Sequence, residues 1–501
     1  MSDLSVPARL LRVAVEASDR TAIQHAGRRR SYARVIEDVL RTARGLHDLG
    51  VRPGHRVAVI AGARAETVIA VHAALRIGAV AVLHDPASTP RELRRAFEDH
   101  SASVAIAEHA ALSAVLSLPR DVAPKALIAI EPLRELGIVP PMLSVLRRGL
   151  GARSDREHPG GSDQVLPWRR VGSVPPLAPD HPYPGPDDLA LLQYGPGPSG
   201  MPLAAMLSHS NLLSAVDALE AVLPQGSTAP LLPLLPLHEA AGTITGITAP
   251  LLTGRGLVLT GPTSSPGLSR VPAAVLCGTP AQIVRRERER PQRRRTGAGG
   301  TQAVLTVHGA LDLEHSRRWR EATGFDPLVG VLRPECGLAL WAVRDDDSPS
   351  VAAWPAPGVR IDIGADGSLS VAGPQVFQGY WHHPDETASV LSGDGWVRTG
   401  DRVDADASAQ HLRVRPQRRG ITTAAGDVVS PREISDVLGS HPDVVSVDVR
   451  AIPQPDGGES AEASVVLRDH GAARVEDLHE FVSARLSPAK RPVSIVLRVP
   501  S

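Results

Sequence analysis

Near its beginning the sequence alternates short apolar runs with helical repeats, and this alternation constrains the fold more than any other feature. RVAVIA (56–61), AVAVLH (79–84) and SVAIAE (103–108) have the length and composition of buried strands. Between them, residues 66–78 and 90–100 repeat apolar side chains at helical spacing. Strand–helix–strand alternation predicts an α/β fold with a doubly wound, mostly parallel sheet.

The rest of the chain predicts a division into two domains. Residues 359–381 are short strands with turns, which indicates a small β-rich part of a large N-terminal domain over 1–401. A helix and strands come after it, which predict a small α+β C-terminal domain over 402–501. Residues 131–186 are rich in Pro, Gly, Arg and Asp, and predict a loop-rich excursion. The arginine run at 285–300 contains interleaved glutamates, and a solvated helix end fits it better than a phosphate or RNA site.

Charge and cysteine content exclude several functional classes. Lys plus Arg and Asp plus Glu are both 54, and this balance argues against a nucleic-acid binder. No apolar run reaches the length of a membrane span, and the first residues do not resemble a signal peptide. The two cysteines make no disulfide framework or metal motif, so we expect a reduced, cytoplasmic protein.

Five segments carry a resemblance to a known superfamily. Together, and in this order, they resemble the AMP-forming acyl-activating ligases, which include acyl-CoA synthetases and fatty acyl-AMP ligases. The segment LALLQY is most similar to the fatty acyl-AMP ligase branch of this superfamily. The resemblance implies ATP and Mg²⁺ as cofactors, an acyl-AMP intermediate, and a thiol acceptor on coenzyme A or an acyl carrier protein. The segments are 49–99, which begins with LGVRPGHRVAVI, and 187–215, 371–391, 394–401 and 428–449.

The segment at 194–204 resembles the superfamily's phosphate loop, but with fewer donors. A triphosphate loop uses glycine N–H groups, hydroxyls and a lysine. Here Leu203 stands at the lysine position, and Pro196 and Pro198 replace hydroxyl residues and also lack a backbone N–H. The segment is either a connector that lost its ligand or a weakened phosphate site. The matching residues, expected to contact nucleotide, are Gly197, Ser199 and Gly200.

The segment GVLRPE (330–335) resembles the adenine and magnesium motif. Glu335 matches the Mg²⁺ ligand and is a candidate catalytic residue. Val331 replaces the aromatic residue that stacks on adenine, and Pro334 replaces a hydroxyl donor. Arg333 offers positive charge to a phosphate or, alternatively, pairs with Glu335 at the surface. The small-residue segment expected beside the nucleotide contains Gly309 and Ala310.

Three further positions match residues of the superfamily's motifs, some more closely than others. Asp401 in RTGD matches the aspartate that accepts hydrogen bonds from ribose hydroxyls, although a turn or linker aspartate is the alternative. Arg415 can correspond to the superfamily's ribose-binding arginine only if the alignment is shifted in register at this point. His238, in the segment 230–252 that resembles the acyl-pocket wall, stands at the gate beside the substrate carboxylate, or is a packed structural histidine. No lysine comes after Lys490, where the superfamily has a catalytic one.

The motifs leave two hypotheses for function. The first is an acyl-activating ligase homologue that takes a fatty acid or another small-molecule carboxylate, expected to be apolar, and has weak or altered activity, because each lost preorganised charge costs about 10²–10³ in rate. The second is a catalytically inactive protein of this fold that binds an active synthetase or acyl carrier protein. Fold alone does not decide between them.

Overall fold

The structure is a computed structural model, and it covers both predicted domains. Residues 131–163 of the predicted excursion and residues 289–300 of the arginine run lie outside its described part. The described residues are 5–130, 164–224, 227–260, 274–288, 301–344, 351–404, 412–415, 420–455, 457–468 and 473–498.

A seven-stranded sheet confirms the predicted strand–helix alternation. Its order is β7-β6-β5-β3-β4-β8-β9, and all neighbours are parallel except the hairpin β8–β9. Helices α3 (Ala65–Arg76) and α4 (Pro90–His100) connect its parallel strands. The strands are β3 (Arg56–Ile60), β4 (Val80–His84), β5 (Val104–Glu108), β6 (Ala126–Ile130), β7 (Gln164–Pro167), β8 (Leu189–Pro196) and β9 (Pro202–Ser208).

A thirteen-stranded sheet forms the second half of the large domain. Its order is β17-β18-β19-β20-β16-β15-β14-β13-β12-β10-β11-β1-β2. Strands β10 to β14 pair in parallel, and from β14 to β17 every pair is antiparallel, which gives the predicted β-rich part. The strands are β1 (Thr21–His25), β2 (Arg28–Ser31), β10 (Leu231–Pro233), β11 (Leu257–Leu259), β12 (Val275–Gly278), β13 (Ala303–Val307), β14 (Leu328–Arg333), β15 (Gly337–Arg344), β16 (Val351–Pro355), β17 (Arg360–Ile363), β18 (Ser368–Ala372), β19 (Val397–Asp404) and β20 (Leu412–Arg415).

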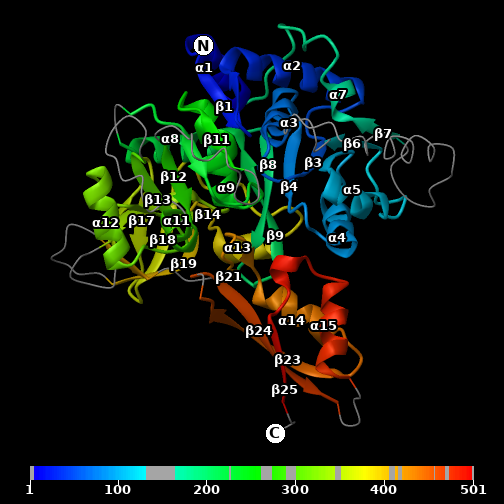
Figure 1. The fold of residues 1–501 in the computed structure, drawn as a ribbon, viewed down its shortest axis with the longest axis vertical. Helices are drawn as coiled ribbons and strands as arrows, with labels where there is room; N and C mark the ends of the chain where they lie inside the picture. The colour runs from blue at the N-terminus through cyan, green and yellow to red at the C-terminus, as the bar shows by residue number, and fades with distance from the viewer. Residues whose placement is uncertain are drawn as a thin grey trace.

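Helices surround and separate these sheets, and one large apolar core joins them (Figure 1). Ser208 caps α8 in a capping box with Asn211, the role that its sequence context favours. Within the described ranges, no helix combines the length and the apolar character that a membrane crossing requires. The remaining helices of this domain are α1 (Val6–Glu16), α2 (Tyr32–Asp48), α5 (His109–Leu116), α7 (Trp168–Val171), α8 (His209–Val222), α9 (Ala240–Thr243), the π-helix η2 (Ile244–Thr248), α10 (Ala249–Leu252), α11 (Pro280–Arg288), α12 (Leu313–Thr323) and α13 (Pro384–Val390).

The small C-terminal domain has its own apolar core, separate from that of the large domain. Strand β20 still pairs with β16 and β19 of the large sheet. We therefore propose that the division falls between 415 and 420, and not after 401. The elements of the small domain are β21 (Ile421–Thr422), β22 (Val428–Val429), α14 (Pro431–Gly439), β23 (Val444–Pro453), β24 (Glu459–Leu467), α15 (Val475–Ser483), the 3₁₀ helix η4 (Pro488–Lys490) and β25 (Ser494–Arg498).

Several histidines are buried in the large domain in their neutral form. Burial lowers the pKa of His72 to about 4, of His84 to about 3 and of His209 to about 4. His72 contacts the carbonyl oxygen of Ile247 in the π-helix at 3.1 Å. An unfolded chain would protonate these side chains near a pKa of about 6.5.

We expect the free energy of unfolding to fall by several kcal/mol as pH is lowered from about 6.5 to about 4, because the unfolded state then binds more protons than the folded one. Above pH 6.5 this contribution to stability is fully present. Urea unfolding at a series of pH values measures it. A His72→Gln variant keeps an N–H for the Ile247 carbonyl and removes one titrating group, so its slope should be shallower. An unchanged slope would contradict the assignment.

Candidate functional site

The hairpin β8–β9 carries the segment that resembles a phosphate loop. Two backbone N–H groups of this loop donate hydrogen bonds to carbonyl groups of the loop itself. The N–H of Gly197 donates to the carbonyl of Met201 at 2.8 Å, and the N–H of Gly200 donates to the carbonyl of Gly197 at 2.9 Å. A Cβ on Gly197 would lie 2.5 Å from the side chain of Leu203, so that leucine fills the space beneath the turn. The two glycine N–H groups expected at a phosphate are therefore satisfied inside the loop.

The tip of the same hairpin contacts the small domain. Arg432 donates to the carbonyl of Ser199 at 3.1 Å, and the Ser430 hydroxyl donates to the carbonyl of Gly200. Figure 1 shows the hairpin reaching toward α14, whose first residues supply these contacts. Ser199 is exposed, and its contact with Arg432 places it at the domain boundary.

Glu335 lies directly after β14 and is buried, with 2% of its surface exposed. The Tyr380 hydroxyl donates to its Oε1 at 2.6 Å. Tyr380 itself is held by a bridge to Ala205 of β9. The alternative of a surface carboxylate is therefore wrong, because Glu335 is buried and accepts a hydrogen bond from a phenol.

Arg333, at the end of β14, reaches Asp401 in β19 instead. Its Nε lies 3.2 Å from Asp401 Oδ2, and its second nitrogen contacts Oδ1, so both carboxylate oxygens are engaged. Asp401 is fully buried, and the Arg333 side chain is 12% exposed. The N–H of Asp401 donates to the Thr399 hydroxyl of the same strand at 3.0 Å. The oxygens that would accept ribose hydroxyls are thus met by a cation of the same chain.

The other residues predicted to contact nucleotide divide between two parts of the large sheet. Gly309 and Ala310 come shortly after β13, next to β14 in the sheet, and both are partly exposed. Gly195 lies against the Pro334 ring, since a Cβ there would be 3.1 Å from Pro334 Cγ. The parallel pairing of β13 and β14 therefore brings the segments of Gly309 and Glu335 to one edge of the sheet. Arg415 ends β20 in the antiparallel part, where its backbone pairs with Arg402 of β19.

The segment that resembles the acyl-pocket wall is tightly packed. Gln193 donates to the carbonyl of His238 at 2.7 Å and accepts from the Thr243 hydroxyl at 2.9 Å. A Cβ on Gly242 would lie 1.8 Å from the carbonyl oxygen of Pro236. The nearby cavity, lined by residues that include Gln193, Thr243 and Arg333, has a volume of about 10 Å³. In this arrangement the cavity has room for about one water molecule.

His238 contacts acidic groups of both domains. Its Nε2 lies 3.4 Å from Asp427 Oδ1 in the small domain, and the adjacent Glu239 accepts the N–H of Val428 at 2.9 Å. Burial opposes the charged form of His238, but Asp427, Glu239 and Asp85 outweigh it and raise its pKa. Burial raises the pKa of Glu239 to about 7. His238 therefore acts between domains and is more than a packed core histidine.

Lys490 forms a second contact between the domains. Its Nζ lies 2.8 Å from Glu92 of α4 in the large domain and 2.9 Å from Glu433 of α14 in the small domain. Burial alone would lower the pKa of Lys490, but the two carboxylates outweigh it and raise that pKa. One of the two lysines in the chain thus holds the domains together.

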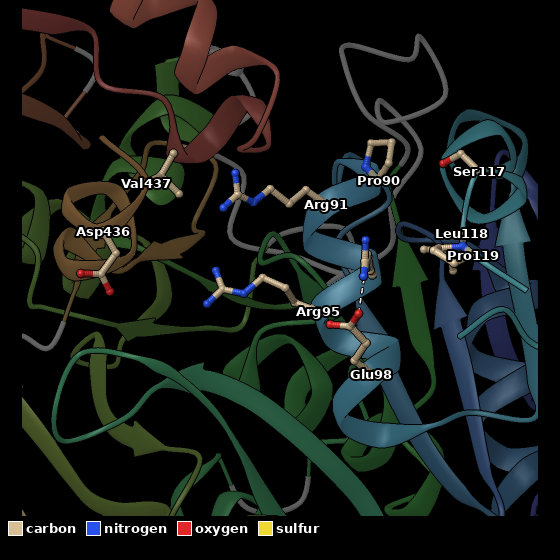
Figure 2. A pocket seen from close by; sticks show the side chains of 10 residues that line it. Pro90, Arg91, Arg95, Glu98, Ser117, Leu118, Pro119, Asp436 and Val437 are labelled. Atoms are coloured by element: carbon tan, nitrogen blue, oxygen red, sulfur yellow. Dashed lines mark hydrogen bonds and ion pairs between the residues drawn. The ribbon is translucent and has the colours of Figure 1, made fainter. Parts of the chain in front are cut away.

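A hollow of about 730 Å³ opens between α4, the end of α5 and α14. Figure 2 shows Arg91 and Arg95 extending from α4 toward Asp436 and Val437. Arg94 on the same helix pairs with Glu98 at 2.7 Å. Burial and the nearby Arg485 and Arg95 lower the pKa of Arg91. Among the residues that the structure describes, neither Arg91 nor Arg95 meets an acidic side chain, so the hollow attracts anions.

Comparison with known proteins decides the family. The model of the AMP-binding enzyme matches residues 10–381, and that of the AMP-binding enzyme C-terminal domain matches residues 433–501. This chain belongs to the AMP-binding enzyme family. It is therefore a member of the acyl-activating, adenylate-forming ligase superfamily, as the sequence motifs predict.

Relatives of this AMP-binding enzyme span nearly its whole length. A long-chain-fatty-acid–CoA ligase of Bacillus subtilis (strain 168) is 24% identical over 96% of this chain and 88% of the relative. A feruloyl-CoA synthase of Amycolatopsis sp. is 28% identical over 98% of this chain and 94% of the relative. The amide bond synthetase of Marinactinospora thermotolerans shares the fold with a TM-score of 0.77 at 22% identity, covering 99% and 95% of the two chains.

Sequence reasoning missed the partners of the predicted residues. Tyr380 stands inside the quoted motif at 371–391, yet nothing in the sequence pairs it with Glu335 across forty-five positions. Asp427 and Lys490 act across the domain boundary, and spacing along the chain does not reveal such contacts. The run PRELRRAF carries the signal for Arg91 and Arg95, because arginines three and four apart share a helix face.

Proposed function

We propose that this AMP-binding enzyme homologue activates a fatty acid or another apolar carboxylate as acyl-AMP and transfers it to a thiol acceptor, at a rate well below that of a fully equipped ligase. The main support is that Glu335 and Asp401, which match the superfamily's Mg²⁺ and ribose residues, are both buried, and that Arg333, two residues before Glu335, contacts Asp401. Carboxylate oxygens suit Mg²⁺, and Glu335 is the residue that would hold it with the nucleotide phosphates. The reduced rate is expected from the loop, whose glycine N–H groups are already bonded.

One observation favours a second function. The buried pair of Arg333 and Asp401 closes the ribose position with a side chain of the same protein. A protein that never binds nucleotide could keep this pair permanently. The second candidate is therefore a catalytically inactive homologue that binds an active synthetase or an acyl carrier protein.

Titration with nucleotides separates these functions. Calorimetry with ATP·Mg²⁺, AMP and a non-hydrolysable acyl-adenylate should show binding of the acyl-adenylate. Pyrophosphate release with a series of fatty acids should be measurable, yet lower by about 10²–10³ for each missing charge. Asp401→Asn should abolish nucleotide binding while urea unfolding checks the fold. No response to any of the three nucleotides would leave the inactive homologue as the function.

The arginine hollow supports an acceptor that carries phosphate. Coenzyme A and the prosthetic group of an acyl carrier protein both do, and the superfamily uses either. We infer that Arg91 and Arg95 meet these phosphates, since guanidinium groups bind phosphate through paired hydrogen bonds.

Arg91→Ala/Arg95→Ala should raise the KM for coenzyme A by tenfold or more, because hydrogen bonds to charged groups contribute about 1.5–3 kcal/mol each. Acyl-adenylate binding should stay unchanged. Steady-state kinetics and calorimetry measure the two quantities. Arg94→Ala is the matched control, since Arg94 already pairs with Glu98 and its loss should move KM little. Equal effects of both variants would contradict the assignment.

A further inference from the structure

Three side chains at the domain boundary form a cluster with the composition of a transition-metal site. His238 and Glu239 precede α9 in the large domain, and Asp427 lies between β21 and β22 in the small one. One potential ligand atom from each lies within 4.8 Å of the others. A neutral imidazole nitrogen and two carboxylates are a ligand set that Zn²⁺ takes, with a fourth position left for water.

The distances in the cluster leave room for a shared ion. His238 Nε2 and Asp427 Oδ1 are 3.4 Å apart, whereas a charge-assisted hydrogen bond measures about 2.7–2.9 Å. Two ligands at about 2.1 Å from a tetrahedral ion are separated by roughly 3.4 Å. The observed spacing is therefore compatible with two ligands of one zinc ion, and the third ligand atom lies within 4.8 Å of both.

Neighbouring groups hold the ligands in place through their other atoms. Thr423 donates to the second oxygen of Asp427 at 3.1 Å, and the N–H of Val428 donates to Oε1 of Glu239 at 2.9 Å. Within the described part of the chain, the other oxygen of Glu239 receives no hydrogen bond. Outer contacts of this kind orient ligands in metal sites. Each carboxylate thus has one oxygen fixed and one directed to the cluster.

We propose that His238, Glu239 and Asp427 bind one divalent transition-metal ion of the Zn²⁺ class, which clamps the small domain to the large one. The clamp does not depend on nucleotide binding or on turnover.

Metal titration of the untagged full chain tests this. After treatment with EDTA, the protein should bind one equivalent of Co²⁺ with visible absorption of a four-coordinate site, and Zn²⁺ should displace it. Mg²⁺ at the same concentration should not. Asp427→Asn and Glu239→Gln, one in each domain, should each weaken Co²⁺ binding at least tenfold. His383→Ala is the control, because His383 pairs with Glu386 on the surface of α13 at 3.6 Å.

A second measurement keeps the test valid if a variant folds poorly. One equivalent of Zn²⁺ should slow proteolysis between the two domains in the wild-type chain and in His383→Ala, and should have no effect in Asp427→Asn. Absence of Co²⁺ binding, or equal binding by wild type and both ligand variants, would overturn the proposal. Neither result bears on the proposed ligase function, which nucleotide titration tests separately.

Discussion

Arg333→Met is expected to lower the free energy of unfolding by about 3–5 kcal/mol, because it removes the guanidinium that contacts both oxygens of the buried Asp401 carboxylate. Asp401 is fully buried and both of its oxygens contact Arg333. Methionine keeps the apolar part of the side chain, so the loss reports the charge. Urea unfolding monitored by circular dichroism measures it.

Two further variants define what the pair does. Arg333→Met/Asp401→Leu removes both charges and should recover most of the stability, since an apolar replacement of a buried pair is often neutral. If Arg333 also blocks the ribose position, Arg333→Met should bind AMP more tightly than the wild type in calorimetry. A loss below about 1 kcal/mol would show that the pair resembles an ordinary surface ion pair.

Lys490→Met is expected to release the small domain from the large one. The substitution leaves Glu92 and Glu433 facing each other, and their side chains are only 11% and 7% exposed. Removing one member of a buried ionic group costs about 3–5 kcal/mol, and separation lets both carboxylates reach water. Small-angle scattering should show a larger radius of gyration, and limited proteolysis should cut between the domains faster.

The chain offers a matched control for this experiment. Lys125 is the other lysine and is exposed, so Lys125→Met changes the same chemical group without a buried partner. It should leave scattering and proteolysis unchanged. Lys490→Arg keeps the charge and should keep most of the docking. Unchanged scattering in Lys490→Met would mean that other contacts hold the domains.

Much of the fold was predictable because apolar periodicity reports local burial. The three strands and two helices near the beginning are expected directly from runs such as RVAVIA and from the helical repeat at 66–78. The position of β20 was not predictable, because LRVR alternates apolar and polar residues like many strands, and its place in the sheet depends on pairing with β16 and β19. Sheet partners distant in sequence leave little local signal.

The sequence motifs single out Glu335 and Asp401 as candidate site residues, and this role stays a prediction. The sequence could not show that Tyr380 contacts Glu335 and that Arg333 contacts Asp401. The sequence suggested that Arg333 binds a phosphate or pairs with Glu335. In the structure its guanidinium instead contacts Asp401 of β19. Side-chain pairing depends on rotamers and register, which sequence spacing leaves open.

The two separate apolar cores have a consequence for motion. Lys490, His238, Arg432 and Ser430 make polar contacts across the boundary, while each domain keeps its own core. Undocking would exchange these contacts for water while each core stays intact. Raised ionic strength would favour it by screening the charges. The small domain could therefore change its position without either domain unfolding.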